Sequence, residues 1–107
     1  GGGREGSVEM KAVWMMHDVV LTDEIQDILD ELGIIGLSRW KRMTGRGPKS
    51  GTRMDNHVWP GANSGAFVVV ADDVAARLMG RLQALRDEVG SRSGVWAFTT
   101  PVDETLR

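Results

Sequence analysis

The residues best suited to bind a ligand lie in a basic, glycine-rich stretch in the middle of this 107-residue chain. Between Lys41 and Asp55 there are five cations and one anion, although the formal net charge of the whole chain is −2. Glycines allow backbone N–H groups to converge on a phosphate, and the cations can neutralise its charge. The alternative is a flexible, solvated basic loop. The residues predicted to contact a bound anion are Gly45, Arg46, Gly47 and Lys49.

A second glycine-rich stretch, GSRSG, runs from Gly90 to Gly94. The hydroxyls of Ser91 and Ser93 and the guanidinium of Arg92 are hydrogen-bond donors, so this turn could supply the opposite wall of the same anion site. The alternative is a plain connection between a helix and a strand, in which Gly90 ends the helix at the C′ position.

The basic stretch belongs to a long loop with aromatic residues at both ends. A loop of this length in a compact domain is usually functional or disordered, and a functional loop is predicted here. Trp40 and Trp59 could stack on a nucleobase, dock the loop on a partner protein, or pack at a subunit interface. The residues predicted to contact a partner protein are Arg53, Met54, His57 and Trp59.

The two histidines offer a second, different hypothesis. His17 ends a predicted strand and His57 lies in the long loop, so the two could meet across a subunit interface and hold a divalent metal. The alternative is that His17 is hydrogen-bonded at the edge of a sheet and that His57 is exposed. A third hypothesis is an interaction module whose loop docks on a partner without any small ligand.

Composition excludes several classes of protein. The absence of cysteine excludes disulfides, thiolate metal sites and a cysteine nucleophile. No nucleophile, base and orienting residue form a recognisable set, so the protein is predicted not to be an enzyme. The mild net charge argues against bulk nucleic-acid binding. No apolar run approaches the roughly 20 residues that span a bilayer, and no secretory segment is visible, so a cytoplasmic protein is predicted.

Hydrophobic periodicity predicts two helices and four strands. The first helix has apolar residues at i, i+3, i+4 and i+7, a cap at Asp23 with Gln26 in capping-box spacing, and a stop at Gly33. Asp72 or Asp73 is expected to cap the second helix. The predicted helices are Thr22–Gly33 and Asp72 to about Val89, and the predicted strands are Lys11–His17, Ile34–Thr44, Ala66–Ala71 and Val95–Thr99.

The same patterns predict which side chains are buried. Trp14 and Trp96 are placed in the core, Arg86 is expected to point outward from the second helix, and Pro101 is expected to end the last strand. The residues expected to form the buried stripe of the second helix are Val74, Leu78, Met79, Leu82, Leu85 and Val89.

The element order, strand–helix–strand–loop–strand–helix–strand, is the split βαβ arrangement of the ferredoxin-like class, an α+β sandwich. Two helices can cover only one face of a four-stranded sheet, yet three of the predicted strands are apolar on both faces. An exposed apolar sheet would promote aggregation. We therefore predict an oligomer that buries the open face of the sheet.

The order and spacing of these elements resemble those of the P-II signal-transduction proteins. The local matches are Gly33–Leu37 with Ser38 before the second strand, Thr44–Gly47 at the base of the loop, Val70–Asp73 at the second helix, and the Gly90–Gly94 turn. Three departures are also visible. The chain has no tyrosine for uridylylation, Val95 stands where the family has a lysine, and Val102–Leu106 lacks the family's basic pair.

The resemblance implies a homotrimer that binds a small effector, an adenine nucleotide, in clefts between subunits. It also implies that the long loop, about residues 45–63, signals to a target protein such as a transporter or an enzyme. Residues 1–9 are expected to be a tag remnant or a disordered N-terminus, and residues 10–107 a single domain. The metal hypothesis at His17 and His57 would move the protein toward the CutA-like branch, which shares the trimeric fold.

Overall fold

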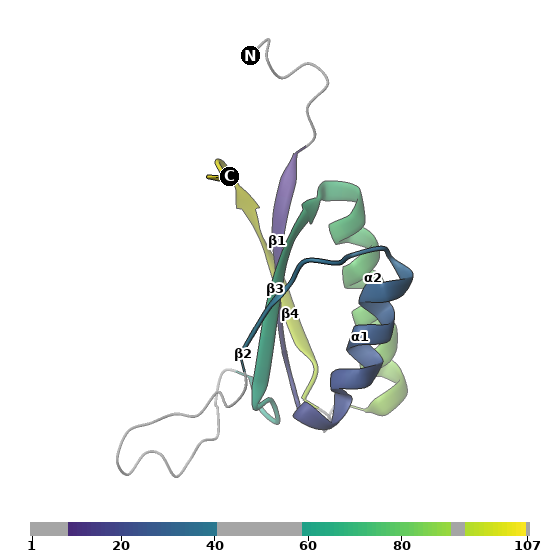
Figure 1. Cartoon of the computed structure of the whole chain (residues 1–107). Coiled ribbons are helices and arrows are strands. Elements are labelled where there is room, and N and C mark those ends of the chain that lie inside the picture. Colours follow the sequence, from purple (N-terminus) through teal and green to yellow (C-terminus); the bar gives the residue numbers. More distant parts are fainter. Residues whose placement is uncertain (1–8, 41–58, 91–93, 107) are drawn as a thin grey trace, which may run out of the picture.

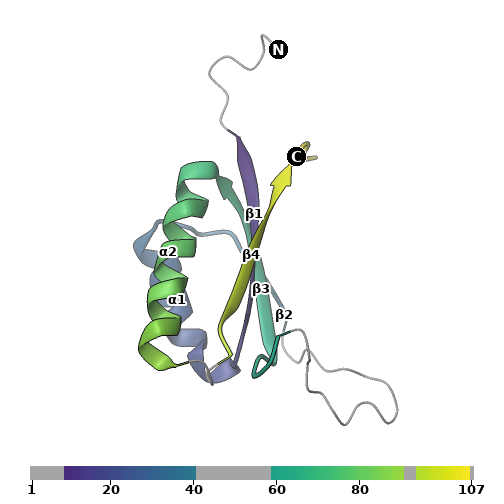
Figure 2. The same cartoon turned by 180° about the vertical axis from the view of Figure 1, so that it is seen from behind.

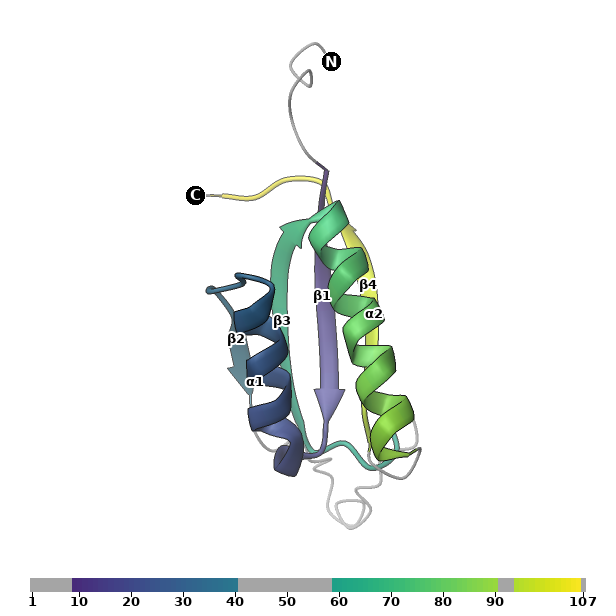
Figure 3. The ribbon, with the colours of Figure 1, turned by 90° about the vertical axis from the view of Figure 1, so that its right-hand side faces the viewer.

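The computed structural model, shown in Figure 1, describes residues 9–40, 59–90 and 94–106. Two α-helices lie side by side on one face of a four-stranded antiparallel sheet with strand order β2-β3-β1-β4 (Figure 3). This is the predicted ferredoxin-like α+β fold. The elements are strand β1 (Met10–His17), the 3₁₀-helix η2 (Val19–Leu21), helix α1 (Thr22–Glu31), strand β2 (Ser38–Trp40), strand β3 (Ser64–Ala71), helix α2 (Asp72–Val89) and strand β4 (Trp96–Val102).

The strand register separates the two faces of the sheet, because successive side chains of a strand point to opposite sides. Met15 of β1 lies opposite Ala66 of β3 and Ala97 of β4, and Val13 lies opposite Val68. These residues face the helices and belong to or contact the hydrophobic core. The helix residues that complete the core include Ile25, Ile28, Leu29, Ala75, Leu78, Leu82 and Leu85.

The opposite face of the sheet is covered by neither helix, as the edge-on views show (Figures 1 and 2). Trp14 lies on this open face, opposite Phe67 of β3 and Phe98 of β4, and Trp96 lies opposite Met16. Both tryptophans are only partly buried, so the prediction that they belong to the core is wrong. Their apolar composition alone could not distinguish the helix-covered face from the open face.

Neither helix uses the predicted side-chain cap. The cap residue of α1 is Leu21 and that of α2 is Ala71, neither with a side-chain cap bond. The turn before α1 is stabilised instead by Asp18, whose carboxylate accepts a hydrogen bond from the Val20 N–H at 3.1 Å. Asp72 forms an ion pair with Lys11 at 2.6 Å.

The predicted end of α1 is confirmed. Gly33 follows the last turn with a φ of +74°, which is the left-handed conformation that glycine adopts readily. The buried stripe of α2 is confirmed at Leu78, Leu82 and Leu85, whereas Val89 is exposed and Ala75 is buried instead.

Among the strand boundaries, the start of β2 and the end of β4 differ most from the predictions. β2 begins only at Ser38, because the chain first crosses from α1 to the edge of the sheet without regular structure and leaves Ile35 93% exposed. β4 continues through Pro101 to Val102, so the expectation that Pro101 ends this strand is wrong. β4 is an edge strand, and an edge position can accommodate a residue that lacks an N–H donor.

Candidate functional site

The segment predicted to bind an anion leaves and rejoins the sheet at one end. Trp40 of β2 pairs with Gly65 of β3. The strand before the segment 41–58 and the first strand after it are therefore neighbours in the sheet. The end of α2 and the start of β4 lie at this same end of the molecule (Figure 3). The predicted contacts that lie outside the described residues are Gly45, Arg46, Gly47, Lys49, Arg53, Met54 and His57 in the loop, and Ser91, Arg92 and Ser93 in the turn.

Gly94, at the end of the predicted turn, contacts the C-terminal end of the long loop. A Cβ atom placed on Gly94 would lie 2.4 Å from the carbonyl carbon of Gly61 and 2.9 Å from the backbone nitrogen of Ala62. The indole N–H of Trp96 also donates a hydrogen bond to the carbonyl of Pro60, at 2.9 Å. The turn before β4 therefore packs directly against the segment that leaves the long loop. This contact joins the end of the turn to the exit of the long loop, while the predicted anion contacts of the loop lie outside the described residues.

The other glycine of the turn ends α2 as predicted. Gly90 has a φ of +93°, and its N–H donates to the carbonyl of Arg86 at 2.9 Å. Gly90 therefore ends the helix as the simpler alternative predicted. This structural role does not exclude a ligand on the turn. The glycines at both ends of the turn adopt conformations that other residues rarely adopt.

Trp59 belongs to an aromatic cluster on the open face of the sheet, defined here as Trp14, Trp59, Phe67, Trp96 and Phe98. The ring of Trp59 stacks on Phe98 with centroids 5.7 Å apart and lies 6.2 Å from Trp96. Trp14 continues the cluster, at 5.9 Å from Phe98 and 4.6 Å from Phe67. Trp59 was predicted to contact a partner, a nucleobase or another subunit. Its observed position is at the exit of the loop on the open face, and all three roles stay predictions.

His17 ends β1 at the same end of the molecule and is fully buried, at 0% exposure. Its Nδ1 lies 2.8 Å from the carbonyl oxygen of Asp18, which can only accept a hydrogen bond, so Nδ1 carries the proton in the neutral ring. Among the described residues Nε2 has no hydrogen-bond partner. Burial lowers the pKa of His17 and the Arg39 charge lowers it further, against the opposing effect of Asp18. The lowered pKa favours the neutral ring, whose Nε2 lone pair has no hydrogen-bond donor within the described ranges.

Of the two histidines in the metal hypothesis, only His17 belongs to the described residues. Within the described ranges, no group of three or more histidine, aspartate or glutamate side chains is arranged to hold a metal ion. His57 lies outside those ranges. The pairing of His17 with His57 thus stays a prediction. In the same part of the chain, no helix has the length and apolar character needed to cross a membrane.

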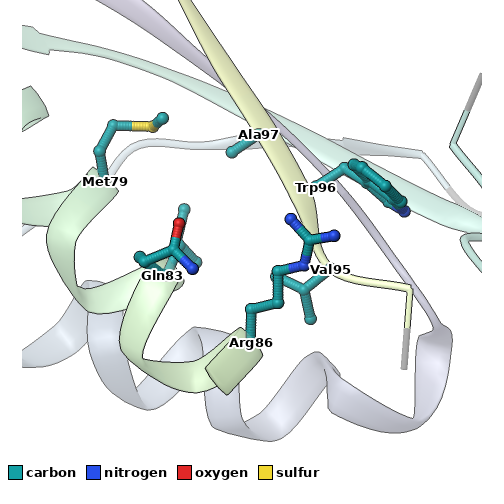
Figure 4. A pocket seen from close by; sticks show the side chains of 7 residues that line it. Met79, Gln83, Arg86, Val95, Trp96 and Ala97 are labelled. Carbon is teal, nitrogen blue, oxygen red and sulfur yellow. The ribbon is translucent and has the colours of Figure 1, made fainter. Parts of the chain in front are cut away.

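One pocket lies beside the turn, between α2 and β4, and the sequence did not predict it. Its volume is about 90 Å³, and Figure 4 shows Arg86 rising from the last turn of α2 toward Trp96. The guanidinium carbon of Arg86 lies 4.3 Å from the centroid of the Trp96 ring. The prediction that Arg86 points outward is therefore wrong, since it is half-buried. In the sequence, the only sign of the contact between Arg86 and Trp96 is that the two residues flank the Gly90–Gly94 turn.

Comparison with solved structures identifies the fold. A nitrogen regulatory PII-like protein, CPII from Thiomonas intermedia K12, bound to ADP, AMP and bicarbonate, matches with a TM-score of 0.66 at 14% identity, over 92% of this chain and 96% of that chain. A PII-like signalling protein from Thermus thermophilus matches with a TM-score of 0.62 at 24% identity, over 89% and 88% of the two chains. A protein of unknown function from Pediococcus pentosaceus ATCC 25745 matches with a TM-score of 0.61 at 10% identity, over 94% and 99%.

The fold of the chain is thus that of the PII-like signalling proteins, as its sequence pattern predicts. Neither a family model nor a curated protein matches the sequence. The structural relatives are similar over nearly their whole length but are less than 25% identical, so their likeness to this chain is a likeness of fold.

Proposed function

We propose that this protein is a divergent PII-like signal-transduction protein and not an enzyme. In this proposal it binds an adenine nucleotide and reports the nucleotide to a partner protein through its basic loop. The observation that carries the proposal is the contact of Gly94 with Gly61, which joins the end of the glycine-rich turn to the C-terminal end of the long loop. The fold supports it, since CPII, which has the same fold, was solved with ADP and AMP.

The proposed nucleotide site combines the loop base with the turn. Backbone N–H groups of glycine-rich segments and nearby cations are suited to bind phosphates. The phosphates would contact both segments, so binding would restrain the loop through the turn. The proposed contacts are Gly45, Arg46, Gly47 and Lys49 from the loop, and Gly90, Ser91, Arg92, Ser93 and Gly94 from the turn.

The proposed assembly is a cytoplasmic homotrimer that buries the aromatic cluster. The open face carries two large apolar side chains that are well exposed in the single chain, Val69 at 39% and Phe98 at 38%. A second copy of this chain would remove this apolar surface from water, which is the main driving force for association. Nucleotide sites between subunits would then depend on the assembly.

Signalling would follow from differential affinity, because a ligand that stabilises one loop conformation changes how well a partner can bind that loop. The partner would be a transporter or an enzyme. The loop residues proposed to contact it are Arg53, Met54, His57 and Trp59.

Calorimetric titration with ATP, ADP, AMP and cyclic AMP tests the nucleotide site. We expect at least one nucleotide to bind at micromolar affinity or tighter, and Arg46→Gln to weaken its binding by at least ~10-fold, because a charge-assisted contact to phosphate is lost. Arg77→Gln is the matched control, since Arg77 is an exposed arginine of α2 that lines neither the turn nor the pocket. The proposal is wrong if no nucleotide binds, or if the two variants weaken binding equally.

Metal binding remains a second candidate, since the buried Nε2 of His17 has no hydrogen-bond partner in the part of the chain that the structure describes. If His17 and His57 hold a divalent ion, zinc, nickel or copper should bind in calorimetry near neutral pH. His57→Ala should then weaken the binding by at least ~10-fold, because a two-histidine site loses half of its protein ligands. Unchanged affinity in His57→Ala would exclude this candidate.

A further inference from the structure

The long loop rejoins the sheet through a β-turn at Trp59–Ala62. The N–H of Ala62 donates a hydrogen bond to the carbonyl of Trp59 at 3.0 Å, and Gly61 has a φ of +86°. A proline at the second position and a glycine with positive φ at the third are the marks of a type II turn. The first residue after the turn, Asn63, donates its N–H to the carbonyl at the end of β1 at 3.0 Å. The turn is therefore the junction between the loop and a fixed part of the sheet.

A type II turn can change to a type I turn with little movement of the chain on either side. The two types differ by rotation of the central peptide, through about 150° in ψ of the second residue and about 170° in φ of the third. Glycine at the third position adopts positive and negative φ about equally readily. The Pro60–Gly61 peptide therefore has two accessible orientations, which makes it a two-state element.

The side chain of Trp96 selects one of these orientations. The carbonyl of Pro60 belongs to the central peptide and takes no part in the hydrogen bond of the turn itself. In the observed orientation it accepts a hydrogen bond from the indole N–H of Trp96 at 2.9 Å. Rotation of the peptide to the type I orientation would point this carbonyl to the opposite side and break the bond. Because a hydrogen bond between neutral groups contributes only a modest free energy, it can bias the turn without locking it.

Trp96 is in contact with both sides of the Gly90–Gly94 turn. On the α2 side, the guanidinium carbon of Arg86 lies 4.3 Å from the centroid of the Trp96 ring, within the range of a cation–π interaction. On the β4 side, Gly94 packs so closely against the carbonyl group of Gly61 that there is no room for a Cβ atom. A change at the Gly90–Gly94 turn is therefore transmitted to the loop exit through two contacts, the indole hydrogen bond and this packing.

We propose that Trp96 is a positioning residue of the nucleotide response, which couples the Gly90–Gly94 turn to the loop through the orientation of the Pro60–Gly61 peptide. This inference rests on the proposed function, because that function assigns the nucleotide phosphates to the Gly90–Gly94 turn. A nucleotide on that turn and a partner on the loop would each bias the same two-state peptide, which is the physical requirement for coupling between two sites. Trp96 acts through the peptide and not by contacting either ligand.

Nuclear magnetic resonance of the full-length protein without nucleotide tests the positioning role. A type II turn brings the Hα of Pro60 close to the N–H of Gly61, and a type I turn separates them, so the nuclear Overhauser effect between these protons reports the turn type. We expect a strong effect in the unmodified protein. Trp96→Phe keeps an aromatic ring but lacks the N–H. It should shift the ratio of the two turn types toward type I by roughly 2- to 10-fold, as expected for the loss of one neutral hydrogen bond.

Trp14→Phe is the matched control. Trp14 belongs to the same aromatic cluster, and its indole N–H donates to the hydroxyl of Thr100 in β4 at 3.3 Å. The same substitution here should leave the Pro60–Gly61 signal unchanged. An unchanged signal in Trp96→Phe, or equal weakening in both variants, would overturn the proposal. If Trp96→Phe does not fold, deuterium exchange of the Trp96 indole N–H in the unmodified protein decides the question. Slow exchange is expected, and exchange as fast as that of a free indole would overturn the proposal.

ADP and ATP, each added to saturation, test the coupling. In the unmodified protein, we expect the Trp96 indole signal and the Pro60–Gly61 signal to change together. In Trp96→Phe, the response of the Pro60–Gly61 signal should be at least ~2-fold smaller, while calorimetry still detects binding. Nucleotide binding without any change at Trp96 or at the turn would overturn this proposal and leave the nucleotide site standing. Absence of binding would overturn the proposed function, and the coupling with it.

Discussion

Gly94→Ala is expected to lower the free energy of unfolding by about 2 kcal/mol or more, which is a large effect for a single methyl group. Two costs combine. The φ of +73° at Gly94 is rarely adopted by residues with a side chain, and the new Cβ would lie 2.4 Å from the carbonyl carbon of Gly61. The carbonyl carbon is part of the backbone and a Cβ is bonded directly to it. No side-chain rotation can relieve this clash, so the main chain must shift. Urea unfolding followed by circular dichroism measures the change.

Gly80→Ala is the matched control for this variant. Gly80 lies within α2, and a Cβ placed on it meets nothing within 4 Å. The same methyl group should therefore raise the stability by roughly 0.5–1 kcal/mol, because alanine favours a helix over glycine. Equal stability of the Gly94→Ala protein and the unmodified protein would contradict the close packing of the turn on the loop exit. If the nucleotide site is formed as proposed, Gly94→Ala should also bind nucleotide more weakly.

The helices and the paired strands could be predicted because local periodicity determines them. The spacing of Ile25, Ile28 and Leu29 gives α1 its buried face, and Gly33 ends it in the expected conformation. The apolar residues at both parities of β1 correctly predicted a strand with two apolar faces. Each of these signals depends on residues that lie close together in the sequence.

The errors concern properties that depend on the neighbours of a strand. Nothing local in the sequence shows that β4 is at the edge of the sheet, and this position is the reason that Pro101 is accommodated within it. The same limit applies to Trp96. Its hydrophobicity indicated burial, while its parity relative to Met16 places it on the open face. The hydrophobic pattern of a strand normally distinguishes its two faces, but it cannot do so where both faces are apolar.

The candidate site could be predicted in composition but not in geometry. Glycines and cations marked the loop and the turn, because these residue types are suited to phosphate whatever their position in the fold. The contact of Gly94 with Gly61 joins residues more than thirty positions apart, and only the fold reveals it. The stacking of Arg86 on Trp96 crosses the turn in the same way, and periodicity alone did not distinguish Arg86 from Arg77.

Val69→Lys is expected to convert the proposed trimer to a monomer at micromolar protein concentration. Val69 is 39% exposed on β3 and its position places it on the open face with the aromatic cluster. A lysine there would have to bury its ammonium group in an apolar interface, and the cost of an unpaired buried charge far exceeds that of losing one valine contact. Sedimentation equilibrium or light scattering coupled to gel filtration measures the change in mass.

The matched control is Ile35→Lys, which introduces the same charge at an apolar residue that is 93% exposed and lies outside the sheet. This variant should keep the mass of the unmodified protein. A monomeric unmodified protein would show that the open face is not a self-association surface, and a trimeric Val69→Lys would place the interface elsewhere. Because the nucleotide is proposed to bind between subunits, a monomeric Val69→Lys should also lose nucleotide affinity while keeping its circular dichroism spectrum. That pair of results would tie the aromatic face of the sheet to the ligand site at its end.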